Sequence, residues 1–227
     1  MRVEVNDLEF SINKTQKYAT VVSDQNCRRD YICIPEIVNG YPVKFIDPFA
    51  FRESAYLRNI AIPNSVIKIK TSAFANCYGL KKVYFYKTAI PARELTVDDH
   101  AFWGCWSLKE FLAGEDISIV CGLEAFKGCR NLEVIQGCLY NLHNRSFENC
   151  FKLNNLIFAP NAWWKTETFK GCTVLKNLTF LGDVEELLPN TCMKWISHRK
   201  IKCRTNTSLA ELIYAGTNIE FIDSVSI

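Results

Sequence analysis

Apolar residues recur along the chain in one local pattern, Ala-Phe-x-x-Cys-x-x-Leu, which is followed by alternating apolar and polar positions. Seven close or relaxed copies begin at Ala50, Ala73, Ala101, Ala125, Ser146, Thr168 and Thr191. These starting residues are separated by 23, 28, 24, 21, 22 and 23 residues, a period typical of repeat solenoids. The pattern therefore predicts one short structural unit that is used seven times.

The copy that begins at Ala73 indicates what each unit forms. Ala73, Phe74, Cys77 and Leu80 have the three-to-four-residue spacing of one helical or 3₁₀ turn. The residues from Leu80 to Phe85 then alternate as in a half-buried strand. A unit this short cannot bury its own apolar faces, so it is stable only between neighbouring copies. We predict a leucine-rich repeat solenoid of about seven turn-plus-strand repeats, with one parallel concave sheet and interior columns of Phe and Cys.

The segments outside the repeats are expected to cover the ends of this solenoid. Residues 1–42 are predicted to form an N-terminal β-hairpin cap, because Leu8, Phe10 and Ile12 alternate and Asn39-Gly40 is a strong hairpin turn. Residues 43–204 hold the seven leucine-rich-type repeats, and 205–227 are predicted to form a short α/β cap. A longer spacing after the second repeat places an insertion at 87–95, which we expect to bulge outward as a loop.

The repeat resembles those of the BspA-like leucine-rich repeat family of Treponema- and Bacteroides-type surface proteins. The resemblance lies in the Ala-Phe-x-x-Cys-x-x-Leu turn and in the step Ile-Pro-x-Ser-Val, found here at Ile62 to Val66. It extends to the entry segment 32–43 and to the tail, and the Ile-Pro step is lost after the third repeat. The resemblance implies a solenoid with a binding role, in adhesion or host interaction at a cell surface.

Net charge and cysteine spacing point to no particular ligand. A net charge of +3 does not by itself indicate a nucleic-acid binder. Most of the cysteines follow the repeat period and none forms a Cys-x-x-Cys pair, so we expect buried apolar thiols in place of metal ligands or a disulfide framework. Because the N-terminus resembles no secretory signal and no stretch is apolar enough to span a membrane, we expect a cytoplasmic protein.

No sequence pattern points to catalysis. The chain has no nucleophile elbow, phosphate-binding glycine loop or metal-binding His-Glu-x-x-His motif. Its three histidines, His100, His143 and His198, each occupy a position in the repeat that a structural role explains. We therefore expect no enzyme activity, no metal and no cofactor or small-molecule substrate, and instead a protein partner.

Two exposed surfaces are the candidate contact sites for that partner. The first is the concave face of the predicted sheet, whose outward positions fall into rows. The candidates on this face are Lys82, Glu110, Tyr84, Leu112, Gln136 and Ile157, together with Tyr86. The rows mix apolar and amide side chains, which favours recognition of a partner. The alternative is that this surface tolerates many residue types and binds nothing.

The second candidate surface is the turn side, where the residue after each Cys should point outward. Tyr78, Trp106 and Phe151 occupy that position, and Trp103 lies nearby. Large exposed aromatic residues are enriched at binding hot spots. The alternative is that a cap or a neighbouring turn covers them.

Two other functions stay open at this point. The segment from His198 to Arg204 makes the C-terminal end basic, so it could contact nucleic acid or an acidic partner. An imperfectly capped end could also drive self-assembly, and the sequence does not fix the oligomeric state.

Overall fold

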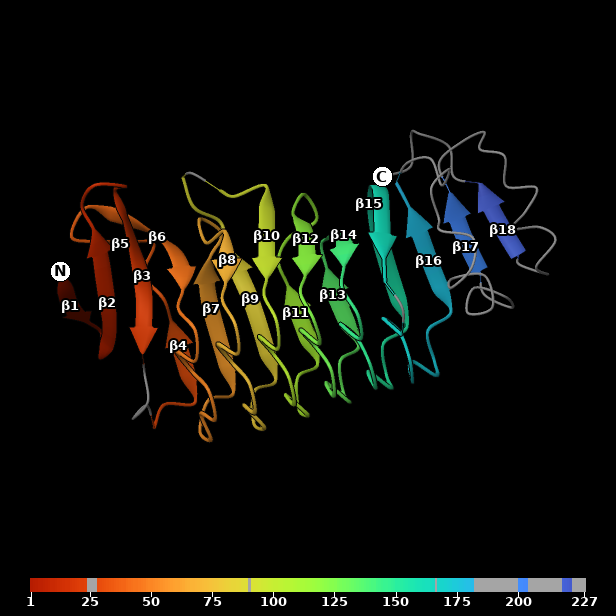
Figure 1. The fold of residues 1–227 in the computed structure, drawn as a ribbon, viewed down its shortest axis with the longest axis horizontal. Helices are drawn as coiled ribbons and strands as arrows, with labels where there is room; N and C mark the ends of the chain where they lie inside the picture. Colours follow the sequence, from red (N-terminus) through yellow and green to blue (C-terminus); the bar gives the residue numbers. More distant parts are fainter. Residues whose placement is uncertain (24–27, 90, 166, 182–199, 204–217, 222–227) are drawn as a thin grey trace.

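The computed structural model is a stack of mostly parallel strands that runs from β1 at the left to β18 at the right, and it describes residues 1–23, 28–89, 91–165, 167–181, 200–203 and 218–221 (Figure 1). The described residues form a β-solenoid and contain no helix. The repeat solenoid predicted from the sequence is thereby confirmed. Each Ala-Phe-x-x-Cys-x-x-Leu segment forms the predicted turn, in which the Cys77 amide donates to the Phe74 carbonyl and the Leu80 amide to the Cys77 carbonyl. These bonds have the three-residue spacing of a 3₁₀ turn and do not continue into a helix.

The first four copies each contribute two strands, so the described residues form two sheets where we expected one. The 13-stranded sheet, called the long sheet below, has the order β1-β2-β3-β6-β8-β10-β12-β14-β15-β16-β17-β18, with β5 paired to β6. The 5-stranded sheet, called the short sheet, has the order β13-β11-β9-β7-β4. The strand after each Leu lies in the short sheet as far as β13, and the strand before the next turn lies in the long sheet.

The strands have the following bounds. The long sheet contains β1 (Arg2–Val5), β2 (Leu8–Asn13), β3 (Tyr18–Ser23), β6 (Tyr41–Ile46), β8 (Lys68–Ile69), β10 (Glu94–Val97), β12 (Ser118–Cys121), β14 (Cys138–Leu142), β15 (Asn155–Trp164), β16 (Asn177–Phe180), β17 (Lys200–Cys203) and β18 (Asn218–Phe221), and β5 is Ile37–Val38. The short sheet contains β4 (Tyr31–Cys33), β7 (Asn59–Pro63), β9 (Lys82–Tyr86), β11 (Glu110–Leu112) and β13 (Val134–Gln136).

A column of phenylalanine rings fills the space between the sheets, as the repeat pattern predicts. Its members, one from each turn, are Phe51, Phe74, Phe102, Phe126, Phe147 and Phe169. Successive rings are stacked and nearly parallel, with interplanar angles of 3° to 8° and centroid separations of 4.9 to 5.7 Å. Phe111 of β11 meets the rings of Phe102 and Phe126 edge-on, so the column is packed from the short sheet as well.

The cysteine position forms a second column, which hydrogen bonds hold to the phenylalanine column. The Cys105 thiol donates to the Phe74 carbonyl at 3.1 Å, and the Cys129 thiol donates to the Phe102 carbonyl at 3.2 Å. Cys77, Cys150 and Cys172 repeat the contact with the Phe carbonyl one turn earlier. The residue at this place must therefore be small, buried and able to donate a hydrogen bond, which explains the choice of Cys.

Backbone hydrogen bonds between repeats complete the turn. The Phe74 amide donates to the Ala101 carbonyl of the next repeat at 2.8 Å, and the Phe102 amide donates to the Ala125 carbonyl at 2.7 Å. The amides of Phe74 and Phe102 are thus satisfied by the following repeat, and their carbonyls accept both from the Cys amide of the same turn and from the Cys thiol of the following repeat.

The repeats lose the loop between their two strands after the third copy. In the second and third copies a loop separates β9 from β10 and β11 from β12, whereas Gly137 alone separates β13 from β14, and β15 runs unbroken from Asn155 to Trp164. Gly137 has a φ of 139°, and a Cβ there would lie 2.5 Å from the Ile119 side chain, so only glycine fits this crossing. Loss of the Ile-Pro step shortens the repeat because the chain passes directly from one strand to the next.

The insertion after the second repeat is fastened to earlier repeats and does not bulge freely. The Thr88 amide and hydroxyl both donate to the Asn64 side-chain oxygen, at 2.8 and 2.7 Å. The Ala89 amide donates to the Glu36 carboxylate at 3.2 Å, and the Ala92 amide donates to the Asn64 carbonyl at 2.6 Å. The described residues between β9 and β10 therefore form a loop, as expected from the sequence, and this loop is tethered to earlier parts of the chain.

The N-terminal residues extend the long sheet. Strands β1, β2 and β3 pair antiparallel, and β3 then joins β6 in parallel. Leu8, Phe10 and Ile12 face inward and are buried, and Asn39-Gly40 forms the predicted hairpin turn between β5 and β6. Strand β4 already belongs to the short sheet, so repeat-like structure begins before residue 43. The cap boundary at residue 42 stays a prediction.

The C-terminal expectations fall largely outside the described residues. The turn of the seventh copy, from Thr191 to His198, and the predicted helix at 208–214 lie outside the described ranges. Strands β17 and β18 continue the parallel pairing of β16, with Asn177 opposite Lys200 and Lys200 opposite Asn218. The exact number of turns therefore stays a prediction.

The interior column gives a direct stability prediction. Changing Phe74 to Ala should lower the free energy of unfolding by about 3–5 kcal/mol, because it removes one ring from a packed column and leaves a cavity. Phe151 is the matched control, since its side chain is 40% exposed and Phe151→Ala should cost about 1 kcal/mol or less. Urea unfolding followed by fluorescence measures both, and equal losses would contradict the column.

Burial should also protect the thiols of the cysteine column. Burial raises the pKa of the Cys105, Cys129 and Cys150 thiols, and for Cys77 a hydrogen bond with Cys105 acts together with burial in the same direction. The reactive thiolate is thus disfavoured. An alkylating reagent should label exposed Cys33 in the native protein and the column only after unfolding, as read by peptide mass spectrometry. Labelling of Cys105 as fast as that of Cys33 would be incompatible with this packing.

Candidate interaction surfaces

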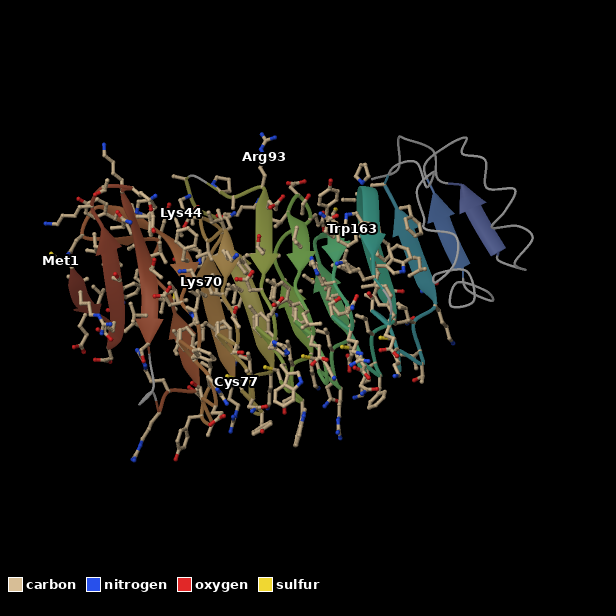
Figure 2. The ribbon with its side chains drawn as sticks, viewed as in Figure 1. Met1, Lys44, Lys70, Cys77, Arg93 and Trp163 are labelled. Carbon is tan, nitrogen blue, oxygen red and sulfur yellow. The ribbon has the colours of Figure 1, made fainter. Side chains whose placement is uncertain are left out.

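Figure 2 shows the two edges of the solenoid on which the candidate surfaces lie. Cys77 marks the edge formed by the Ala-Phe-x-x-Cys-x-x-Leu turns, called the turn edge below. Lys44 and Arg93 lie toward the opposite edge. Between the edges, the outward positions of β4, β7, β9, β11 and β13 form the outer face of the short sheet.

The outer face of the short sheet has the registered rows that the sequence predicts. Lys82 lies opposite Glu110, and Tyr84 lies opposite Leu112. The Lys82 ammonium and the Glu110 carboxylate form an ion pair at 2.6 Å, and the row continues from Leu112 to Gln136. These side chains are half-buried, so part of each is presented to solvent and part packs along the sheet.

Two outward positions differ from the simple rows. Ile157 is exposed and lies on β15, which pairs with β14 and β16 of the long sheet, and its ladder partner is Thr179. Alternation along β7 makes Ala61 an outward position, yet its side chain is buried. Ala61 lies opposite both Cys33 and Tyr84.

A cluster of tyrosines occupies the N-terminal end of this face. The Tyr31 and Tyr84 hydroxyls are 2.9 Å apart, and the Tyr86 hydroxyl donates to the Ile34 carbonyl at 2.7 Å. The hydrogen bond with Tyr84, together with burial, raises the pKa of the Tyr31 hydroxyl. Burial raises the pKa of Tyr86 to about 12, with the nearby Cys33, Glu36 and Tyr84 acting in the same direction. Tyr31 was not among the predicted site residues because it precedes the first recognised repeat.

The turn edge carries the exposed aromatic side chains that the position after each Cys predicts. Tyr78 and Trp106 are 46% and 47% exposed, and Trp103 and Phe151 are exposed as well. The rings of Tyr78 and Trp106 have centroids 4.6 Å apart at a 44° tilt. The guanidinium of Arg130, from the next repeat, lies 5.2 Å from the centre of the Trp106 ring. Neither a cap nor a neighbouring turn hides these aromatics.

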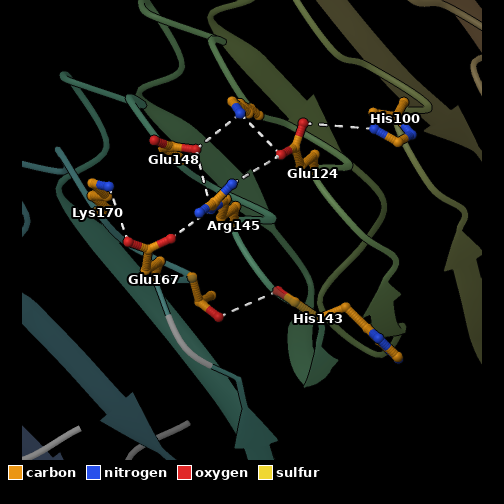
Figure 3. Close-up of polar contacts among 9 residues, drawn as sticks. His100, Glu124, His143, Arg145, Glu148, Glu167 and Lys170 are labelled. Carbon is orange, nitrogen blue, oxygen red and sulfur yellow. Dashed lines mark hydrogen bonds and ion pairs between the residues drawn. The ribbon is translucent and has the colours of Figure 1, made fainter. Parts of the chain in front are cut away.

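Later repeats carry a network of ion pairs at the start of the turn, which Figure 3 shows. Glu124 lies 2.9 Å from Lys127 and 3.6 Å from His100, and Lys127 also contacts Glu148 at 3.1 Å. Glu167 joins Arg145 to Lys170, and those two cations lower the pKa of the Glu167 carboxyl. Single-sequence reasoning missed this network, because its partners come from different repeats and meet only when the repeats are stacked.

The described residues offer no arrangement that indicates catalysis or metal binding. Within them, no group of three His, Cys, Asp or Glu side chains is placed to hold a metal ion. His100 faces Glu124, and the His143 ring packs against Trp163 at 5.7 Å. In the part of the chain that the structure describes, no helix has the length and apolarity to cross a membrane.

Comparisons with known proteins agree with this architecture. The family model described as "BspA type Leucine rich repeat region" matches residues 25–138 and 95–220 and finds 6 copies of the repeat. No curated protein sequence gives a significant match.

Three solved structures share the fold. The Leucine Rich Repeat protein of T. pallidum is 17% identical, with a TM-score of 0.54, over 99% of this chain and 100% of that one. A leucine-rich repeat protein from Bacteroides ovatus is 20% identical, with a TM-score of 0.52, over 96% and 67%. A leucine rich cell surface protein from Faecalibacterium prausnitzii is 20% identical, with a TM-score of 0.53, over 97% and 47%.

The tyrosine cluster predicts how stability depends on pH at the alkaline end. An unfolded tyrosine ionises near pH 10, whereas folded Tyr86 keeps its proton to about pH 12. The contribution of Tyr86 should therefore be complete below about pH 10 and be lost as pH rises through about 12. Urea unfolding across this range should show that the free energy of unfolding falls less steeply with pH for Tyr86→Phe than for the wild type. The control, Tyr56→Phe at an exposed position, should behave as the wild type does. Identical slopes for all three would contradict the burial of this hydroxyl.

Proposed function

The chain belongs to the BspA-type leucine-rich repeat family, and on that premise we propose that it is a non-catalytic module that recognises a protein partner. The partner contacts the outer face of the short sheet and the exposed aromatics of the turn edge. The biological setting that we propose is adhesion, host interaction or inhibition of the bound protein, as the resemblance to surface repeat proteins implies.

The observation that carries this proposal is the division of each repeat into a fixed interior and a variable exterior. The interior positions repeat Phe, Cys and Leu, whereas the outward positions differ from one repeat to the next. Tyr84, Leu112 and Gln136 follow one another along the sheet, and Tyr78 and Trp106 follow one another along the turn edge. Tyrosine and tryptophan bury large areas at little cost in conformational entropy, which is why they dominate binding hot spots.

The test is affinity capture from a lysate of the source organism. The wild type should retain a defined protein, and Tyr84→Glu/Leu112→Glu or Trp106→Glu should each reduce that retention about tenfold or more, because a charge replaces a buried contact. Lys14→Glu, on an exposed turn away from both surfaces, is the control and should bind as the wild type does. Retention that survives both surface variants, with unchanged thermal unfolding, would refute the proposed contact surfaces.

A further inference from the structure

We propose that the first half of the turn edge binds an acidic, extended segment of the partner protein. The site consists of Arg58, Lys81, Lys109 and Arg130 around the rings of Tyr78 and Trp106, and is called the cationic edge below. This inference rests on the proposed function, because it names the chemistry of the partner at one of the two surfaces. It depends on three features of the site: unpaired positive charge, the orientation of the aromatic rings, and the contrast with the later repeats.

Four cations of the cationic edge lack an acidic partner. Backbone hydrogen bonds between successive repeats place three of them in one row: the Lys81 amide donates to the Arg58 carbonyl at 2.7 Å, and the Lys109 amide donates to the Lys81 carbonyl at 2.8 Å. Among the described residues, no carboxylate lies within ion-pair distance of Arg58, Lys81, Lys109 or Arg130. The row is bounded by Asp30 before Arg58 and by Glu133 after Lys109. Glu133 is itself paired with Lys152 at 3.6 Å.

The aromatic rings are held among these cations. The Arg58 guanidinium donates to the Ala55 carbonyl at 2.9 Å and lies over Gly79, where an added Cβ would be 1.5 Å from its nitrogen. Trp106 is flanked by the Tyr78 ring from the preceding repeat, at a 44° tilt, and by the Arg130 guanidinium from the following repeat, which lies over the Trp106 ring. The Trp106 side chain is still nearly half-exposed.

The cations and the exposed rings favour the same kind of ligand. The Arg and Lys side chains attract carboxylates, and the exposed Tyr78 and Trp106 side chains add contact area for the rest of a peptide. Nucleobases bind single-strand platforms by stacking on open ring faces, and the Arg130 guanidinium already lies over the Trp106 ring. A carboxylate-bearing peptide thus fits this surface better than a nucleic acid does.

The cations at the start of the later turns are paired, unlike those of the cationic edge. Lys127, Arg145 and Lys170 each form ion pairs with one or more of Glu124, Glu148 and Glu167 (Figure 3). In the first copy Arg52 pairs with Glu53, and Lys70 pairs with Asp47. Stacked strands are about 4.8 Å apart, so Arg58 to Arg130 span roughly 15 Å, the length of about five extended peptide residues.

The experiment selects peptides from a random library displayed on phage, with the full chain as target. Selected sequences should be enriched in Asp and Glu, and the best synthetic peptide should bind about tenfold or more weakly to Lys81→Glu/Lys109→Glu. Lys81→Arg/Lys109→Arg should retain wild-type affinity, and so should Tyr84→Ala/Leu112→Ala on the other surface. Affinity should fall as salt rises, because the contacts are exposed charge pairs.

The outcomes separate this inference from the proposed function. Peptides without acidic enrichment, whose binding is lost in Tyr84→Ala/Leu112→Ala but not in the charge-reversed variant, would overturn the cationic edge and leave the proposed function standing. Peptides that bind both variants as well as the wild type would contradict both. Tighter binding of single-stranded oligothymidylate than of any selected peptide, abolished by the same charge reversal, would overturn the assignment of an acidic peptide.

Discussion

The turn of each repeat can satisfy the amide of its phenylalanine and bury the ring only against the turn of the next repeat. The Phe102 amide donates to the Ala125 carbonyl, and the Phe102 carbonyl, which accepts from the Cys105 amide of its own turn, also accepts from the Cys129 thiol. An isolated repeat would leave the Phe amide unpaired and expose both faces of the ring. Stability is therefore a property of neighbouring pairs of repeats, and the sequence must keep Phe and a small donor in every copy.

The same constraint leaves the outward positions free to specialise. The rings at the interior place stack throughout the described repeats, whereas the neighbouring outward position changes from Tyr78 to Trp106 to Arg130. Because the stack fixes the register, outward side chains of successive repeats become neighbours whatever their identity. This produces the tyrosine cluster, the cationic edge and the ion-pair network on one scaffold, and each surface is built by residues far apart in the chain.

Sequence periodicity predicted the interior well and the two-sheet architecture poorly. The Phe and Cys columns, the strand after each Leu and the outward position of Trp106 follow directly from the repeat. The second strand of the first repeat was missed because it is short: β8 has two residues, and only Ile69 of them is buried. The merged strands and the tethered insertion depend on Gly137 and Asn64, whose roles appear only in three dimensions. The rows of outward positions have the predicted register within the short sheet, whereas Ile157 lies on β15, which pairs within the long sheet.

The most direct test of the account is native-state hydrogen exchange at the amides of the phenylalanine column. The amides of Phe51, Phe74, Phe102, Phe126 and Phe147 each donate to the next repeat, at 2.7 to 2.9 Å. They should be among the slowest to exchange. The amides of Phe74, Phe102, Phe126 and Phe147, whose turns have described neighbours on both sides, should exchange with nearly the same free energy of opening. Rapid exchange at Phe74, Phe102 or Phe126, comparable with that of the exposed turn residue Phe151, would show that the turns are not joined through this column.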